Sequence, residues 1–108
     1  MVRVPSTNTE AFTVEFSGEL TIRSMANVHR QLLDAFAGHS SVTGRVADDA
    51  AVDLTFVQLI ESARRSARDD GKTFRLASAA TGSLLETLER GGFLADAERR
   101  DFWLSGDL

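Results

Sequence analysis

The stretch of sequence that decides the fold is Val52-Asp53-Leu54-Thr55-Phe56-Val57-Gln58-Leu59-Ile60. A helix can begin at Asp53, because its carboxylate can accept the free backbone N–H groups of a first helical turn. Apolar side chains then recur at the spacing of one helix face. The side chains expected to enter the core from this face are Phe56, Leu59, Ile60, Ala63 and Ala67. The stretch therefore predicts an amphipathic helix that starts near Asp53.

The opposite face of this helix is polar, and the helix ends at a clear stop signal. The side chains expected to point outward are Gln58, Glu61, Arg64, Arg65 and Arg68. These arginines could bind a phosphate or contact an acidic partner, but acidic residues interleave with them, which favours a solvated helix face. Asp69-Asp70-Gly71-Lys72 then ends the helix and turns the chain.

Two segments near the N-terminus alternate between apolar and polar residues, as strands do. They are residues 12–16 and 19–22, and Ser17-Gly18 lies between them. A serine–glycine turn between two short alternating segments predicts a β-hairpin. Residues 1–10 are polar, contain the only proline and are expected to form a flexible lead-in. A single folded domain is therefore expected over residues 11–108.

A helix is predicted after this hairpin, with Ser24 as its N-cap and Gly38 at its end. The apolar face of this helix consists of Met25, Val28, Leu32, Leu33 and Phe36. Residues 42–46 follow as a short strand, although Gly44 is unusual inside a strand. A helix and a strand therefore precede the helix that starts near Asp53.

Strand and helix patterns continue beyond the central helix. Residues 73–77 alternate as a strand does. Ser83 and Glu86 stand at capping-box spacing at the start of an apolar stripe that ends at Gly91-Gly92. Residues 102–104 are apolar between charged stretches, and form either a last strand or a short helix. This order of elements predicts an α/β domain whose parallel strands are joined by crossovers.

The composition narrows the class of protein and of partner. The chain has 108 residues, of which 43% are hydrophobic and 26% are charged, as in ordinary globular domains. Its net charge is −4, so it lacks the cationic surplus with which a generic nucleic-acid binder displaces counterions. No apolar run is long enough to span a membrane, and the first residues do not resemble a secretory signal. We therefore expect a cytoplasmic protein that does not bind nucleic acid.

No constellation of residues indicates an enzyme or a metal site. The chain has no cysteine, which excludes disulfides, thiolate catalysis and cysteine-ligated metals. His29 and His39 could share a metal with Asp34, but no motif sets their spacing, and solvated histidines are the simpler interpretation. Ser40-Ser41 has no identifiable base nearby in the sequence. We expect no enzymatic activity, no cofactor and no metal.

Several local strings, taken in order, resemble the STAS domain, which is the module of anti-sigma-factor antagonists. Residues 16–22, FSGELTI, are similar to the opening GELDI hairpin of that family. Residues 52–60, VDLTFVQLI, are similar to its central (I/V)DSSGLGLL segment. Residues 67–76 resemble the connection to the next strand, and the residues that match the closing helix are Leu84, Leu88 and Gly92-Phe93. The resemblance covers about residues 12–94.

The resemblance implies a mixed sheet of four to five strands flanked by three to four helices. It also implies binding to partner proteins without turnover of a substrate. Many members are switched by phosphorylation of the Ser or Thr directly after the conserved Asp, and the kinase doubles as the anti-sigma factor. That position is Leu54 here, and the nearest hydroxyl belongs to Thr55. Thr55 is thus the one phosphoacceptor candidate, with a plain helix-start hydroxyl as the alternative, and we expect no phosphoswitch of the usual kind.

Two functions follow from the resemblance. The first is a regulatory interaction module that binds a kinase-like anti-sigma factor or a sensor kinase in bacterial signalling. The second is a small accessory subunit that holds the ATPase of a phospholipid-transport ATP-binding-cassette complex. The residues expected to contact the partner are Asp49, Asp53, Leu54, Thr55, Gln58, Glu61 and Arg65.

Overall fold

The computed structural model describes residues 12–105, so the expected lead-in over residues 1–10 lies outside the described part. The elements are, in chain order, β1 (Phe12–Phe16), β2 (Glu19–Leu20), the 3-10 helix η1 (Ile22–Ser24), α2 (Met25–Gly38), β3 (Ser41–Val46), β4 (Ala51–Val52), α3 (Leu54–Asp69), β5 (Thr73–Leu76), α4 (Gly82–Arg90) and α5 (Ala97–Ser105). Strands and helices alternate through most of the chain, which confirms the α/β class.

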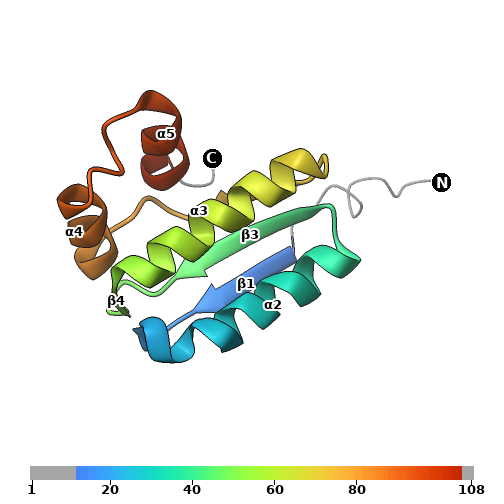
Figure 1. Cartoon of the computed structure of the whole chain (residues 1–108), viewed down its shortest axis with the longest axis horizontal. Coiled ribbons are helices and arrows are strands. Elements are labelled where there is room, and N and C mark those ends of the chain that lie inside the picture. The colour runs from blue at the N-terminus through green and yellow to red at the C-terminus, as the bar shows by residue number, and fades with distance from the viewer. Residues whose placement is uncertain (1–11, 106–108) are drawn as a thin grey trace.

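Two small sheets form the framework. One has three strands in the order β1-β3-β5, and the other pairs β2 with β4. Every strand pair in the described part of the chain is parallel. The single mixed sheet of four to five strands is therefore a wrong expectation. Figure 1 shows α2 and α3 side by side across one face of the larger sheet, with α4 and α5 gathered beyond α3.

The predicted hairpin over residues 12–22 does not form. Phe16 is in register with Val46, and Leu20 is in register with Val52, so β1 and β2 pair with different strands. The intervening Gly18 has a φ of 75°, and its carbonyl accepts a hydrogen bond of 2.9 Å from the backbone N–H of Ala51. The chain therefore bends at the glycine without reversing its direction.

The hydrophobic core lies between the larger sheet and its two covering helices. Strand residues of one parity face the helices, and the helices contribute fully buried Phe56, Val57 and Ile60. Leu59, which was expected in the core, is only partly buried, and Leu33 is 59% exposed. Val57 is fully buried although it was not expected in the core, whereas Leu59 is only partly buried. Helix α3 is therefore covered on more than the side that faces the sheet.

Gly44 occupies the centre of the larger sheet because two aromatic rings leave no room for a side chain. A β-carbon at this position would lie 3.2 Å from the ring of Phe16 and 3.3 Å from the ring of Phe74. Both distances are shorter than ordinary van der Waals contact. A residue that weakens a strand locally thus permits closer packing of the rings.

The C-terminal segment forms helix α5, and this helix changes the surroundings of α3. Trp103 is fully buried, and its indole N–H donates a hydrogen bond of 2.7 Å to Glu61 Oε2. Arg64 also pairs with Glu61, at 3.2 Å. Glu61 is therefore buried, and its expected outward placement is wrong, because α5 covers the part of α3 that periodicity marks as polar.

Two predicted serine caps have other roles. Ser83 lies inside α4, and its hydroxyl accepts a hydrogen bond of 2.9 Å from the backbone N–H of Val52, which ties α4 to β4. Ser24 does stand at the N-cap position of α2, but its hydroxyl accepts the N–H of Thr21 and donates to the carbonyl of Glu19. Both hydroxyls connect neighbouring segments and do not cap the helices as expected.

Candidate functional site

The candidate site is built around Asp53, at the junction of β4 and α3. Asp53 Oδ1 accepts a hydrogen bond of 3.0 Å from the backbone N–H of Thr55, which confirms the predicted N-cap. The hydroxyl of Thr55 donates to the same oxygen. Asp53 Oδ2 accepts a hydrogen bond of 3.1 Å from the backbone N–H of Ile22. One carboxylate therefore holds the start of α3 against η1.

These hydrogen bonds stabilise the charged form of Asp53. The side chain of Thr55 has the largest effect and lowers the pKa of Asp53 below its ordinary value of 3.8. Burial opposes this effect, whereas the backbone N–H groups of Ile22, Thr55 and Phe56 add to it. Asp53 is therefore an anion at neutral pH, which suits a structural cap and not a proton donor.

Thr55 is half-buried, and its hydroxyl is engaged by Asp53. This geometry is the one expected of a helix-start hydroxyl. A phosphate on Thr55 would break the hydrogen bond and bring about −1.5 to −2 charges next to the carboxylate. The free N–H groups at a helix start favour an anion, but here Asp53 already takes the N–H of Thr55.

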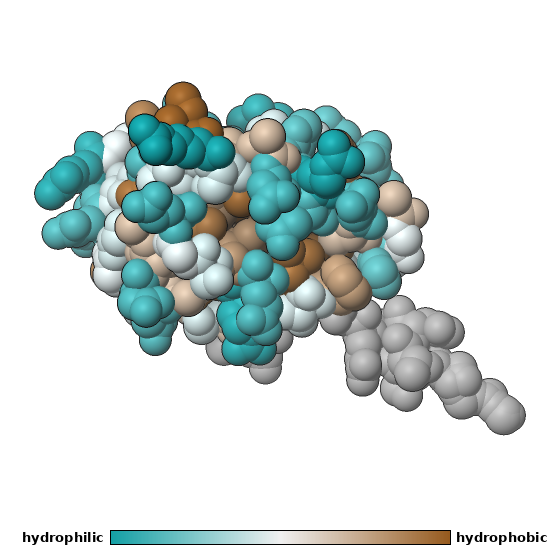
Figure 2. All heavy atoms as spheres, turned by 90° about the horizontal axis from the view of Figure 1, so that it is seen from below, coloured by the Kyte–Doolittle hydropathy of each residue, from teal (hydrophilic) through white to brown (hydrophobic). Residues whose placement is uncertain are grey.

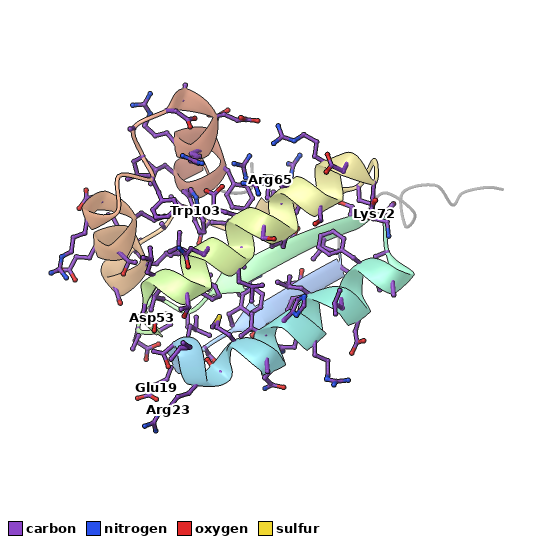
Figure 3. All side chains as sticks on the ribbon, in the orientation of Figure 1. Glu19, Arg23, Asp53, Arg65, Lys72 and Trp103 are labelled. Carbon is purple, nitrogen blue, oxygen red and sulfur yellow. The ribbon has the colours of Figure 1, made fainter. Side chains whose placement is uncertain are left out.

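Two residues directly linked to Asp53 expose large apolar side chains: Ile22 through its hydrogen bond, and Leu54 as the next residue of the chain. Ile22 is 69% exposed and Leu54 is 45% exposed. Figure 3 shows Glu19 and Arg23 at the same corner of the molecule as Asp53, and both are exposed. Figure 2 shows apolar atoms projecting at the end of the molecule where η1 lies. We use the name Asp53 face for the surface formed by the apolar pair Ile22 and Leu54 together with the charged rim residues Glu19 and Arg23.

Sequence reasoning missed the rim residues Glu19 and Arg23 of this face and, above all, Ile22. The alternation over residues 19–22 placed it in the second strand of a hairpin, where its side chain would pack on a sheet. The structure ends β2 at Leu20 and places Ile22 at the start of η1. Because Ile22 and Asp53 are 31 positions apart in the sequence, no local pattern could predict their contact.

The other predicted contact residues are only partly brought together. Asp49 and Gln58 are exposed, and Gln58 follows Leu54 by one helical turn on α3. Arg65 is exposed too, but it lies roughly 16 Å along the helix from Leu54, at a rise of about 1.5 Å per residue. Glu61 is buried beneath α5, so it does not belong to the exposed face.

An open hollow of about 400 Å³ adjoins the site on the side of α4. Its lining combines Val52, Asp53 and Leu54 with Thr87, Arg90 and Gly91. The site therefore offers an open hollow of mixed apolar and polar lining beside the exposed leucine. Because the hollow is open, it suits a contact between proteins better than the enclosed binding of a small molecule.

The two histidines do not form a metal site with Asp34. His39 is held by its ring nitrogen Nδ1, which donates to the carbonyl of Ala35 at 3.0 Å, and its ring stacks on Phe12. His29 lines a separate hollow between α2 and α3. Within residues 12–105, no three His, Asp or Glu side chains are grouped so that they could hold a metal ion.

Comparison with protein-family models, with curated proteins and with solved structures found no match for this chain. The resemblance to the STAS domain therefore rests on the residues quoted above. Among residues 12–105, every helix is too short or too polar to cross a membrane.

Proposed function

We propose that this chain is a non-enzymatic regulatory protein-interaction module that resembles an anti-sigma-factor antagonist. Its partner would be a kinase-like anti-sigma factor or a sensor kinase of a bacterial signalling pathway in the cytoplasm. The observation that carries the proposal is the Asp53 face, where Ile22 and Leu54 expose apolar surface on a framework joined by one carboxylate. Large apolar side chains in fixed positions are typical centres of protein interfaces.

The rim of this face supports a specific contact. Glu19 and Arg23 carry opposite charges and are both exposed near the apolar pair. Charges at the rim of an interface contribute to the choice of partner and to the association rate more than to affinity. The apolar pair would therefore supply most of the binding energy, and the rim would select among partners.

Binding in this proposal does not depend on phosphorylation. Leu54 stands where the resemblance places the phosphorylated hydroxyl, and a leucine cannot accept phosphate. The hydroxyl of Thr55 is turned to Asp53 and is only half-exposed. The contact would thus depend on the concentration of the partner and on the fit between the two protein surfaces.

A crosslinking experiment in the native cells tests this function. The tagged chain is expressed at its natural level, crosslinked and analysed by mass spectrometry beside the double variant Ile22→Glu, Leu54→Glu. Leu33→Glu is the matched control, because Leu33 is 59% exposed on α2, outside the Asp53 face. We expect the double variant to lose the partner by about tenfold or more and the control to retain it.

The identity of the captured protein distinguishes the two functions. A protein with a histidine-kinase-like or sigma-regulating domain supports the signalling module. Capture of the ATPase of a lipid transporter through the same face would instead support the accessory-subunit function and would contradict the signalling module. Equal recovery of every protein by wild type and double variant would contradict the assignment of the Asp53 face.

A further inference from the structure

Within residues 12–105, strand β1 forms an edge of the larger sheet, and its outer backbone groups have no strand partner. In residues 12–105 no strand lies against the side of β1 that faces away from β3. The carbonyl of Phe16 accepts a hydrogen bond of 2.9 Å from Ala47, which continues the β3 side of the strand. Because backbone groups alternate in direction along a strand, Thr13 and Glu15 direct their N–H and C=O groups outward. An exposed edge of this kind is a template for another strand.

A groove runs beside this edge, between β1 and α2. Its volume is about 320 Å³, and its lining includes Phe12, Thr13, Glu15, Gln31, Asp34 and His39. Figure 2 looks onto the α2 side of the molecule and shows apolar atoms between hydrophilic side chains there. An edge strand beside a helix offers backbone hydrogen bonds on one side and side-chain contacts on the other.

One end of the groove carries an apolar anchor that is held in position. Phe12 is 43% exposed, and its ring stacks on the ring of His39 with centroids 4.2 Å apart and planes 13° apart. The hydrogen bond from His39 Nδ1 to the carbonyl of Ala35 orients the imidazole. The exposed phenylalanine is therefore available for contact with an apolar side chain.

The charges of the groove select the class of occupant. Asp34 and Glu15 are among its lining residues, and within residues 12–105 that lining includes no lysine or arginine. Glu15 has one cross-strand partner, Arg45, at 3.9 Å, and both side chains are well exposed, so this pair neutralises it weakly. A second copy of the chain would bring the same carboxylates to the edge. A cationic segment fits better.

We propose that the β1 edge binds an extended, basic peptide segment of a partner protein by strand addition. The backbone of the segment pairs with Thr13 and Glu15, and an apolar side chain packs on Phe12. Lysine or arginine side chains on the other face of the segment approach Glu15, and Asp34 adds negative charge beside the groove. This surface is distinct from the Asp53 face, and the inference does not rest on the function proposed above.

The probe for the first test is a fluorescein-labelled peptide, acetyl-Thr-Lys-Val-Lys-Val-Lys-Thr-amide, measured by fluorescence anisotropy at low salt. We expect it to bind, and the peptide with Glu in place of Lys not to bind. Two further peptides carry N-methyl groups on alternate residues. An added strand donates hydrogen bonds from one alternating set only. One methylated peptide should therefore lose affinity by about tenfold or more, while the other keeps it. Equal binding by both would show charge attraction alone and overturn the proposal.

The second test removes one outward donor from the protein itself. Thr13→Pro deletes an N–H that does not pair with β3, which an edge strand tolerates, and Thr13→Val is the matched control. The fluorescence of buried Trp103 verifies that both variants fold. We expect a loss of about tenfold or more in peptide affinity for Thr13→Pro and little change for the control. Asp34→Lys, on the exposed side of α2, should weaken binding without any change to the strand.

Hydrogen exchange measured by NMR gives an outcome that does not depend on a variant. In the free protein the amides of Thr13 and Glu15 should exchange quickly, and the Lys peptide should slow both. The amides of Val14 and Phe16 face β3 and should stay protected throughout. Slow exchange of Thr13 and Glu15 without peptide would show that this edge is already occupied, and a dimer in light scattering would show self-pairing. Either result would overturn the proposal.

Discussion

Trp103 and Glu61 form a hydrogen bond of 2.7 Å in the interior, although 42 positions separate them in the sequence. The indole N–H of Trp103 is a donor only, and Glu61 is the acceptor that satisfies it. Glu61 also pairs with Arg64 and with Arg99, at 3.2 Å and 3.5 Å. A carboxylate on the predicted polar face of α3 therefore joins α5 to the rest of the domain.

Removal of the Glu61 carboxylate should be strongly destabilising. Glu61→Ala leaves the N–H of Trp103 and the partly buried guanidinium of Arg64 without this acceptor, and we expect a loss of about 3–5 kcal/mol in the free energy of unfolding. Urea unfolding followed by circular dichroism measures the loss. The matched control is Glu98→Ala. The side chain of Glu98 is 60% exposed, so its ion pairs with Arg68 and Arg64 should together contribute less than about 1 kcal/mol. Equal effects of the two variants would contradict the role given to Glu61.

Gly44 should not tolerate a methyl group. The added β-carbon would lie 3.2 Å and 3.3 Å from the rings of Phe16 and Phe74, so Gly44→Ala should destabilise the fold by about 1–3 kcal/mol through overpacking. Gly38→Ala is the control, because a β-carbon there meets no atom within 4 Å, and it should be neutral or slightly stabilising. Thermal unfolding of both variants decides the point: a neutral Gly44→Ala would mean that the rings are free to move apart.

The cap formed by Asp53 should stabilise the domain only above acidic pH. Asp53→Ala is expected to lower the free energy of unfolding by about 0.5–2 kcal/mol at neutral pH. The folded-state pKa of Asp53 lies below its ordinary value of 3.8, so this stabilisation is present above that value and is lost as the pH falls through the folded-state pKa.

The measurement for Asp53 is urea unfolding of wild type and Asp53→Ala between neutral pH and the most acidic pH at which the wild type remains folded. The difference between the two should stay level at neutral pH and shrink below about pH 4. Asp49→Ala is the control in an exposed turn and should follow the wild type. A difference that grows with acidity would have the wrong sign for a lowered pKa.

Two neighbouring residues of α3 should differ in their contribution to stability. Ile60 is fully buried, so Ile60→Ala should cost about 2–5 kcal/mol through lost contacts and a cavity. Leu59 is partly buried and lines the open hollow between α2 and α3, so Leu59→Ala should cost clearly less. The urea midpoints of the two variants rank their stabilities. A larger loss of stability for Leu59→Ala would mean that α3 is rotated about its axis so that Leu59, and not Ile60, enters the core.

Thr55 should have little influence on partner affinity through its hydroxyl. Thr55→Ala is expected to leave affinity nearly unchanged, whereas Thr55→Glu and Gln58→Trp should weaken it by placing charge or bulk beside the Asp53 face. Intact mass of protein from the native cells tests the alternative directly, since a phosphate adds about 80 Da to a hydroxyl residue. Stoichiometric phosphate on Thr55 would establish a phosphoswitch in place of a steric contact.

The start of α3 could be predicted from a few adjacent residues. A cap at Asp53 followed by apolar side chains at helical spacing is a local pattern, and the cap forms as predicted. The strand segments at residues 12–16, 42–46 and 73–77 were also evident, because alternation along a strand is local too. Their boundaries agree with β1, β3 and β5 to within one residue.

The partners of these elements depend on contacts between distant parts of the chain. Periodicity marks one face of a helix as polar, but it contains no information about whether a later helix will cover that face, as α5 covers Glu61. A turn signal at Ser17-Gly18 likewise cannot distinguish a reversal from a bend, because the bend is stabilised by the backbone of Ala51. The approach of Ile22 to Asp53 follows from that bend. The candidate site therefore arises where two parallel strands end side by side, and local patterns do not specify that meeting.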